Sequence, residues 1–308
     1  MVIANPIYDV VFKKMMENDK VAKFFIGTLL DQIIESVEVK PQEFTYTNEL
    51  TALAVFRLDF IATIKTETGE LKKILIEIQK AKNHIDLMRF RNYLAEQYKK
   101  EDEVNGVKMI LPITTIYILG FKLPEIESPC LKVERNYKDL VQNTRIETKS
   151  DFIEKLTHDS YVVQVERITD KYQTKLDKLL SLFEQKNFTD DRKIVKEFMH
   201  EIDTEDIKLT TDILHFSGTN TEERQKLEIE QEAWRTVDAM TGDLRSKLEN
   251  SLKINLEKDK TLKEKDNVIT EKDNVISEKD NLIHEKDKSL EEMNRIIEEL
   301  QRKLQDKK

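Results

Sequence analysis

VFRLDFIATIKTETGELKKILIEIQK, residues 55–80, predicts a β-hairpin around which the rest of the chain is organised. Two apolar runs flank Thr66-Glu67-Thr68-Gly69, a polar loop whose glycine tolerates the positive φ that such loops need. Side chains alternate between the two faces of a strand, so each arm has an apolar face. On the other face an acid interrupts the apolar pattern: Asp59 in the first arm and Glu77 in the second.

These two acids admit two interpretations. An unpaired carboxylate is costly to bury in strands rich in β-branched residues, and two acids on neighbouring strands can offset that cost by sharing a divalent cation. Alternatively, Asp59 and Glu77 are ordinary solvated acids on a hairpin. The two residues alone favour the solvated interpretation; their sequence context favours the metal site.

That context is a series of short motifs in a fixed order. The spacing from Asp59 to Glu77-Ile78-Gln79-Lys80 resembles the D…ExK signature of PD-(D/E)XK nucleases. The accompanying motifs are Asn5-Pro6-Ile7-Tyr8-Asp9-Val10-Val11-Phe12-Lys13, Arg57-Leu58-Asp59, Arg89…Tyr93…Tyr98 and Leu111-Pro112-Ile113-Thr114-Thr115-Ile116-Tyr117-Ile118-Leu119. Residues 1–200 thereby resemble the PD-(D/E)XK nuclease family transposases, also called Rpn-type recombination-promoting nucleases.

The resemblance implies an α/β fold with a PD-(D/E)XK restriction-endonuclease-like core, in which a mixed sheet of αβββαβ order is flanked by helices. It also implies a metal-dependent DNA endonuclease that acts in recombination, mobile-element activity or defence. Asp59 and Glu77 would hold Mg²⁺, with Mn²⁺ as the alternative ion. Gln79 stands where the wider family has a lysine; an amide orients water by hydrogen bonds but cannot act as a cation or general base.

A basic cluster follows these acids. Residues 80–100 contain six basic and two acidic side chains, which suits a phosphate backbone lying beside the site. We expect Lys80, Lys82, Arg89 and Tyr93 to contact DNA, although strand alternation sends Lys80 to the face opposite Glu77. Arg89 and Tyr93 lie one helical turn apart, and Gln97 extends the same face. The alternative is a packing helix with a surface arginine.

Hydrophobic periodicity independently predicts the order helix, three strands, helix, strand. The expected segments are a helical region at 6–36 broken at Asn18-Asp19, an extended segment at 37–47, the hairpin, a helix at 85–104 and a strand at 111–119. Beyond them we expect a strand at 161–165, helices at 173–186 and 190–203, and a linker at 216–221.

Three regions are predicted: a nuclease-like domain with its extension at 1–203, a helical accessory region at 204–256 and a heptad-repeat coiled coil at 257–308. The last contains near-copies of EKDNVIT that begin at Glu264, Glu271 and Glu278. The heptad register places Ile269, Ile276 and Ile283 at a, Lys272, Lys279 and Lys286 at d, and Val268, Val275 and Leu282 at g. We expect a loosely paired helix that joins protomers into a homo-oligomer.

Composition sets the outer bounds. The chain has 308 residues, a net charge of −9 and one cysteine, Cys130, so an intramolecular disulfide and a cysteine-built zinc site are excluded. Neither a secretory signal nor an apolar run of ~20 residues is evident, and we expect a cytoplasmic protein with no membrane contact. The rival to a nuclease is a catalytically decayed nuclease fold that serves as a DNA-binding or coiled-coil scaffold.

Overall fold

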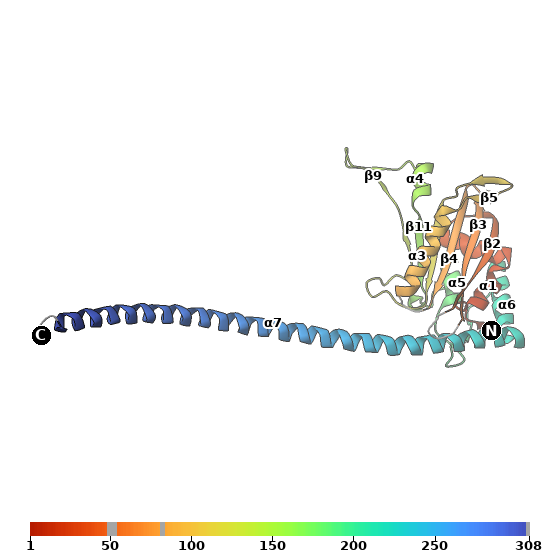
Figure 1. Cartoon of the computed structure of the whole chain (residues 1–308). Helices are drawn as coiled ribbons and strands as arrows, with labels where there is room; N and C mark the ends of the chain where they lie inside the picture. Colours follow the sequence, from red (N-terminus) through yellow and green to blue (C-terminus); the bar gives the residue numbers. More distant parts are fainter. Residues whose placement is uncertain (48–53, 81–83, 306–308) are drawn as a thin grey trace. The chain divides into compact units, whose positions relative to one another are not determined.

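The computed structural model describes the backbone of residues 1–47, 54–80 and 84–305 and shows an α/β protein with a mixed six-stranded sheet (Figure 1). The chain divides into two compact units, Met1–Asp238 and Ala239–Lys308. The first unit contains the sheet, in the order β2-β3-β4-β7-β11-β8, and the second is the continuation of a long helix.

The hairpin predicted at 55–80 is confirmed. Its arms are β3 (Ala54–Thr66) and β4 (Leu71–Gln79), which pair antiparallel, and Gly69 in the loop has φ +84°. β2 (Ile34–Thr47) pairs antiparallel with β3 and forms an edge of the sheet. An edge strand tolerates the proline at position 41, because one row of its backbone groups has no strand partner.

The other half of the sheet is mainly parallel. After β4 the chain passes through α3 (His84–Lys99) into β7 (Ile113–Leu119), which pairs parallel with β4. β11 (Asp159–Gln164) pairs parallel with β7, and β8 (Cys130–Val133) pairs antiparallel with β11 at the second edge. The predicted order of helix, three strands, helix and strand is therefore present.

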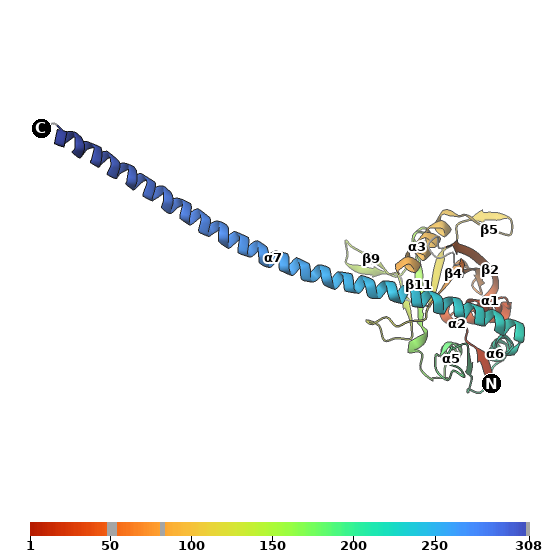
Figure 2. The ribbon, with the colours of Figure 1, turned by 60° about the horizontal axis from the view of Figure 1, so that its bottom comes forward.

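The larger core lies between the sheet and a helical layer formed by α1 (Asp9–Met16), α2 (Asp19–Leu30) and α5 (Lys175–Phe183). Figure 2 shows this layer on one side of the sheet and α3 on the other. The predicted break at Asn18 is confirmed: its side chain accepts hydrogen bonds from the Lys20 and Val21 amides and caps α2.

The helix predicted at 190–203 is wrong. This segment instead contains β12 (Val195–Glu197), which pairs antiparallel with β1 (Val2–Ala4). The Lys196 side chain is buried, and its ammonium donates to the carbonyls of Ser181 at 2.9 Å and Glu184 at 2.6 Å, at the end of α5. Pairing with a distant strand and capping of a helix end thus overrode the local helical pattern.

The linker predicted at 216–221 is shorter than expected, because α6 (Glu205–Thr219) continues through most of it. Gly218 allows α6 to approach β1 closely: a Cβ at this position would lie 2.9 Å from the Ala4 nitrogen. The actual break is at Asn220, whose side chain accepts from the Glu222 and Glu223 amides and so begins α7 (Thr221–Gln305).

The helix predicted at 85–104 ends early, at Lys99. A short hairpin of β5 (Asp102–Val104) and β6 (Val107–Met109) follows it. Asn105 and Gly106 both have positive φ, 52° and 79°, as a two-residue type I′ turn requires. The Asn-Gly pair is a strong hairpin signal, and it interrupts the helical pattern predicted for this segment.

The residue after β4 connects the sheet to the helices. The Lys80 ammonium forms an ion pair with Glu230 of α7 and lies over the rings of Tyr8 and Trp234, at 4.2 and 4.7 Å from their centroids. The Glu230 carboxylate also accepts from the amides of Asp9 and Val10 at the start of α1. One largely buried carboxylate therefore connects β4, α1 and the first turns of α7.

We predict that Glu230→Gln lowers the free energy of unfolding of the first unit by about 3 kcal/mol, because it leaves the Lys80 charge buried without its counter-ion. Trp234 is the only tryptophan, so its fluorescence during urea unfolding reports this region. Glu228→Gln is the matched control: Glu228 lies half a turn away with a side chain 38% exposed, and its loss should cost less than about 1 kcal/mol. Equal effects of the two variants would contradict the structural role of Glu230.

Candidate functional site

Strand alternation along β4 separates two environments. Ile74, Ile76 and Ile78 are buried in the larger core. Leu75 belongs instead to a smaller cluster under α3 with Ile61, Phe90, Tyr93 and Ile113. Glu77 is two residues after Leu75 and therefore faces α3, where it is only 1% exposed. An acid is thus buried in the middle of the sheet, on the face that α3 covers.

The register of the hairpin locates Asp59 relative to Glu77. The antiparallel ladder pairs Ile61 with Leu75 and Phe60 with Ile76. The ladder ends at this second pair, and Asp59 and Glu77 are the next residues of the two strands. By alternation Asp59 shares the face of Ile61, and Glu77 shares the face of Leu75. The structure thus places both residues one step beyond the last ladder pair, and the Asp59 side chain lies outside the described residues.

On the other side of β4, Glu77 pairs with Tyr117 of the parallel strand β7. Tyr117 is half-buried, and its ring lies 4.7 Å from that of Phe90. Burial raises the pKa of Tyr117 to about 12; a hydrogen bond with Thr115 opposes this rise, and the negative charge of Glu77 adds to it. A phenol therefore stands within electrostatic reach of the buried carboxylate.

In the sequence, Tyr117 is predicted only as part of a strand. Alternation within residues 113–119 would have put Tyr117 on the same face as Thr115. The parallel pairing of this strand with β4, on which the neighbourhood of Glu77 and Tyr117 depends, leaves no local signal in the sequence.

Helix α3 covers this face of the sheet. Tyr93 and Gln97 are buried, which confirms that they share a face and shows that this face is turned toward the protein interior. Arg89 lies one helical turn before Tyr93, toward the N-terminal end of α3. Its side chain lies outside the described residues. The interpretation of α3 as a packing helix therefore holds for Tyr93 and Gln97.

The remaining predicted site residues do not all lie on the same face of the sheet. Gln79 is half-buried, shares the Glu77 face by alternation and pairs with Leu119 of β7. Lys80 lies on the opposite face, as alternation predicted, in the ion pair with Glu230 described above. Lys82 falls within residues 81–83, which lie outside the described residues. The structure thus brings Glu77, Gln79 and Tyr117 together and separates Lys80 from them.

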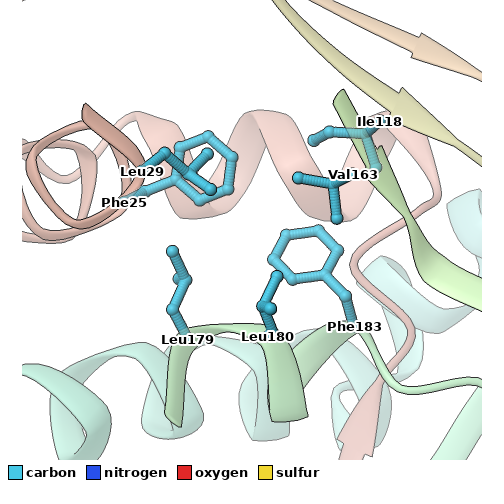
Figure 3. A pocket seen from close by; sticks show the side chains of 7 residues that line it. All are labelled: Phe25, Leu29, Ile118, Val163, Leu179, Leu180 and Phe183. Carbon is cyan, nitrogen blue, oxygen red and sulfur yellow. The ribbon is translucent and has the colours of Figure 1, made fainter. Parts of the chain in front are cut away.

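A small apolar hollow lies on the other side of the sheet. Figure 3 shows its lining, in which side chains of α2, α5, β7 and β11 converge, among them Phe25, Ile118 and Phe183. The hollow is lined only by hydrocarbon and has no room for a water molecule. It offers no group for chemistry or polar recognition, so the Glu77 face remains the candidate site.

In the described part of the chain, which does not include the Asp59 side chain, no three His, Cys, Asp or Glu side chains are grouped as a metal site would require. None of the helices in residues 1–47, 54–80 and 84–305 combines the length and apolar character of a membrane span.

Comparison of the chain with models of protein families, with curated proteins and with solved structures finds no match.

We predict that Glu77→Gln lowers the pKa of Tyr117 from about 12 toward its ordinary value of 10, since it removes a negative charge that disfavours the tyrosinate. In ¹³Cζ-tyrosine NMR titrations, with Tyr117→Phe used to assign the resonance, Tyr117 should begin to ionise at lower pH in Glu77→Gln. Glu70→Gln, in the exposed hairpin loop, should leave this titration unchanged. An unaltered Tyr117 resonance in Glu77→Gln would contradict the electrostatic coupling.

Proposed function

We propose that the protein is a Mg²⁺-dependent endodeoxyribonuclease of the PD-(D/E)XK type. The observation that carries the proposal is the burial of Glu77 in β4, on the α3-covered face. Asp59 is the next residue of β3 beyond the last ladder pair, as Glu77 is of β4. The order of helix, three strands, helix and strand supports it, because this is the order that the resemblance implies for the catalytic core.

The donor types fit the ion. Carboxylate and main-chain oxygens are the ligands that Mg²⁺ and Mn²⁺ prefer, and Asp59, Glu77 and the Ile78 carbonyl would supply them. When bound, such an ion lowers the pKa of its water and neutralises charge on the scissile phosphate. A buried Glu77 also fits this role, because a counter-ion would offset the cost of holding its charge away from water.

The protein's own residues would orient the reactants. Gln79 shares the Glu77 face, and its amide can hold the attacking water by hydrogen bonds without accepting its proton. Tyr117 stands beside Glu77 with its hydroxyl kept protonated at neutral pH, so it is available as a hydrogen-bond donor to a phosphate oxygen. Arg89, at the start of α3, is the proposed phosphate contact. Lys80 has no part in this arrangement and is reassigned to the Glu230 ion pair.

Cleavage of supercoiled plasmid DNA tests the proposal. We expect nicking or linearisation by the wild type in Mg²⁺ or Mn²⁺. Asp59→Ala and Glu77→Ala should reduce the rate by about 100-fold or more, since metal charge stabilisation is worth several kcal/mol. Glu70→Ala, which removes an exposed acid from the same hairpin, is the matched control and should cleave as the wild type does.

Mn²⁺ binding measured by electron paramagnetic resonance, without DNA, provides a second readout. Binding should be lost in Asp59→Ala and Glu77→Ala and retained in Glu70→Ala. A folded wild type that neither cleaves DNA nor binds Mn²⁺ would overturn the nuclease proposal and favour a scaffold.

The apolar stripe of the second unit favours self-association, which would serve a nuclease or a scaffold. Apolar side chains recur every seven residues along α7 and are each 49–57% exposed: Leu262, Ile269, Ile276, Ile283, Leu290 and Ile297. A single helix cannot bury this stripe, whereas a second copy of the same helix matches its spacing. Each lysine at d is followed by an aspartate at e, such as Lys272 and Asp273, which allows ion pairing between helices.

We predict that the double variant Ile276→Lys and Ile283→Lys weakens self-association by about 100-fold or more, because each copy loses the burial of two large side chains. Analytical ultracentrifugation of the full chain measures this. The variant Asn274→Lys and Asn281→Lys adds the same charge on the opposite side of the helix and should associate as the wild type does. Unchanged association of the Ile variant would place the contact elsewhere.

A further inference from the structure

The segment between the edge strand β8 and β11 forms a small hairpin of β9 (Tyr137–Asp139) and β10 (Thr144–Ile146), followed by α4 (Asp151–Leu156). Figure 1 shows this hairpin standing out beyond the end of the sheet. Its tip carries Leu140 and Val141, which are 86% and 95% exposed. No other large apolar side chain in the described part of the chain is as exposed as these two.

A structured turn presents these side chains. The Asp139 carboxylate accepts hydrogen bonds from the Val141 amide at 2.7 Å and the Gln142 amide at 3.0 Å. Asn143 then takes a left-handed conformation with φ 58° and returns the chain to β10. The apolar tip is therefore held outward by local hydrogen bonds.

The base of the hairpin is anchored to the first unit. The Arg135 guanidinium pairs with Asp159 at 2.7 Å and with Glu154 at 2.6 Å, and the Tyr137 hydroxyl donates to Glu154 at 2.6 Å. Next to Asp159, His158 shares a hydrogen bond of 2.8 Å with the hydroxyl of Tyr98, near the end of α3. Ion pairs and hydrogen bonds thus hold the base of the hairpin in place, and the bond from His158 to Tyr98 connects this region to the helix that covers Glu77.

The charges behind the tip fit an anionic partner. Lys138 and Arg145 lie directly opposite each other in the ladder, an arrangement of like charges that disfavours the hairpin by itself. Residues 132–149 contain five basic and three acidic side chains in a chain whose net charge is −9. Of the acids, Asp139 accepts from the tip amides, and Glu134 pairs with Lys132 at 3.0 Å. Glu147 pairs with Arg145 at 3.2 Å, in an exposed ion pair in which a phosphate could replace the carboxylate.

We propose that the β9–β10 hairpin is a wedge that enters the minor groove of duplex DNA, with Leu140 and Val141 at a base step and Lys138 and Arg145 at the flanking phosphates. Strands rise about 3.3 Å per residue, so these cations lie roughly 7 Å behind the tip. The minor groove is about 7.5 Å deep, so a tip at its floor brings both cations to the level of the phosphates. Apolar wedges of this kind unstack a base step and bend the duplex.

This inference rests on the proposed action on DNA, but its test does not require cleavage. The full chain carrying Glu77→Gln is mixed, in Ca²⁺, with a duplex of about 30 base pairs that contains 2-aminopurine, whose fluorescence rises when a base is unstacked. Two double variants are compared with it: Leu140→Ser with Val141→Ser, and Lys138→Gln with Arg145→Gln. The control is Met199→Ser, an apolar side chain 72% exposed outside the hairpin.

The tip variant should lose the fluorescence rise and bind about 10-fold more weakly, with the salt dependence of binding unchanged. The Lys138 and Arg145 variant should instead reduce the slope of log K against log salt by about 2, one unit for each lost phosphate contact. The Met199 control should behave as the parent protein does. A tip variant that unstacks DNA like the parent would overturn the wedge.

The proposed function and the wedge fail in different ways. Plasmid cleavage by the wild type together with unaltered unstacking by the tip variant would retain the nuclease and reject the wedge. Tip-dependent unstacking by a chain that never cleaves would retain the wedge and reject the nuclease. Tip-dependent sedimentation with phosphatidylserine vesicles, without DNA binding, would reject the wedge and assign the tip to an anionic lipid surface.

Discussion

The alternation of side chains along β4 is the constraint on which the rest of the first unit depends. Ile74, Ile76 and Ile78 enter the larger core, whereas Leu75 and Glu77 face α3. A shift of one residue in the register of β4 would point the Glu77 side chain into the larger apolar core and would point the isoleucines toward α3. The apolar face of β4 therefore fixes the position of the acid that we assign to chemistry.

Lys80 shows how the same alternation separates the site from its support. It follows Gln79 directly, yet it points the other way and binds Glu230 between the rings of Tyr8 and Trp234. Since Glu230 also caps α1, one carboxylate holds the end of β4 against two helices. The backbone that carries Glu77 and Gln79 is thus braced from the opposite face, which favours a rigid site.

Two exposed apolar features among the described residues, the stripe along α7 and the tip of the β9–β10 hairpin, differ in kind. The stripe along α7 repeats every seven residues, a spacing that a second copy of the same helix would match. The tip of the β9–β10 hairpin has no such repeat, and the opposed cations behind it support the anionic partner that we propose.

The sequence by itself determined the hairpin, its two faces, the order of the core elements and the heptad tail, because each depends on a local period of 2, 3.6 or 7 residues. Tertiary structure decided the rest. The strand at 195–197 forms because β1 pairs with it. Gly218 lies within α6 at the point where the helix backbone approaches β1 too closely for a side chain. Tyr117 meets Glu77 only because β7 pairs parallel with β4 across the α3 crossover. Such contacts join residues far apart in the chain and are chosen by burial and hydrogen bonding across the whole sheet, for which no local pattern exists.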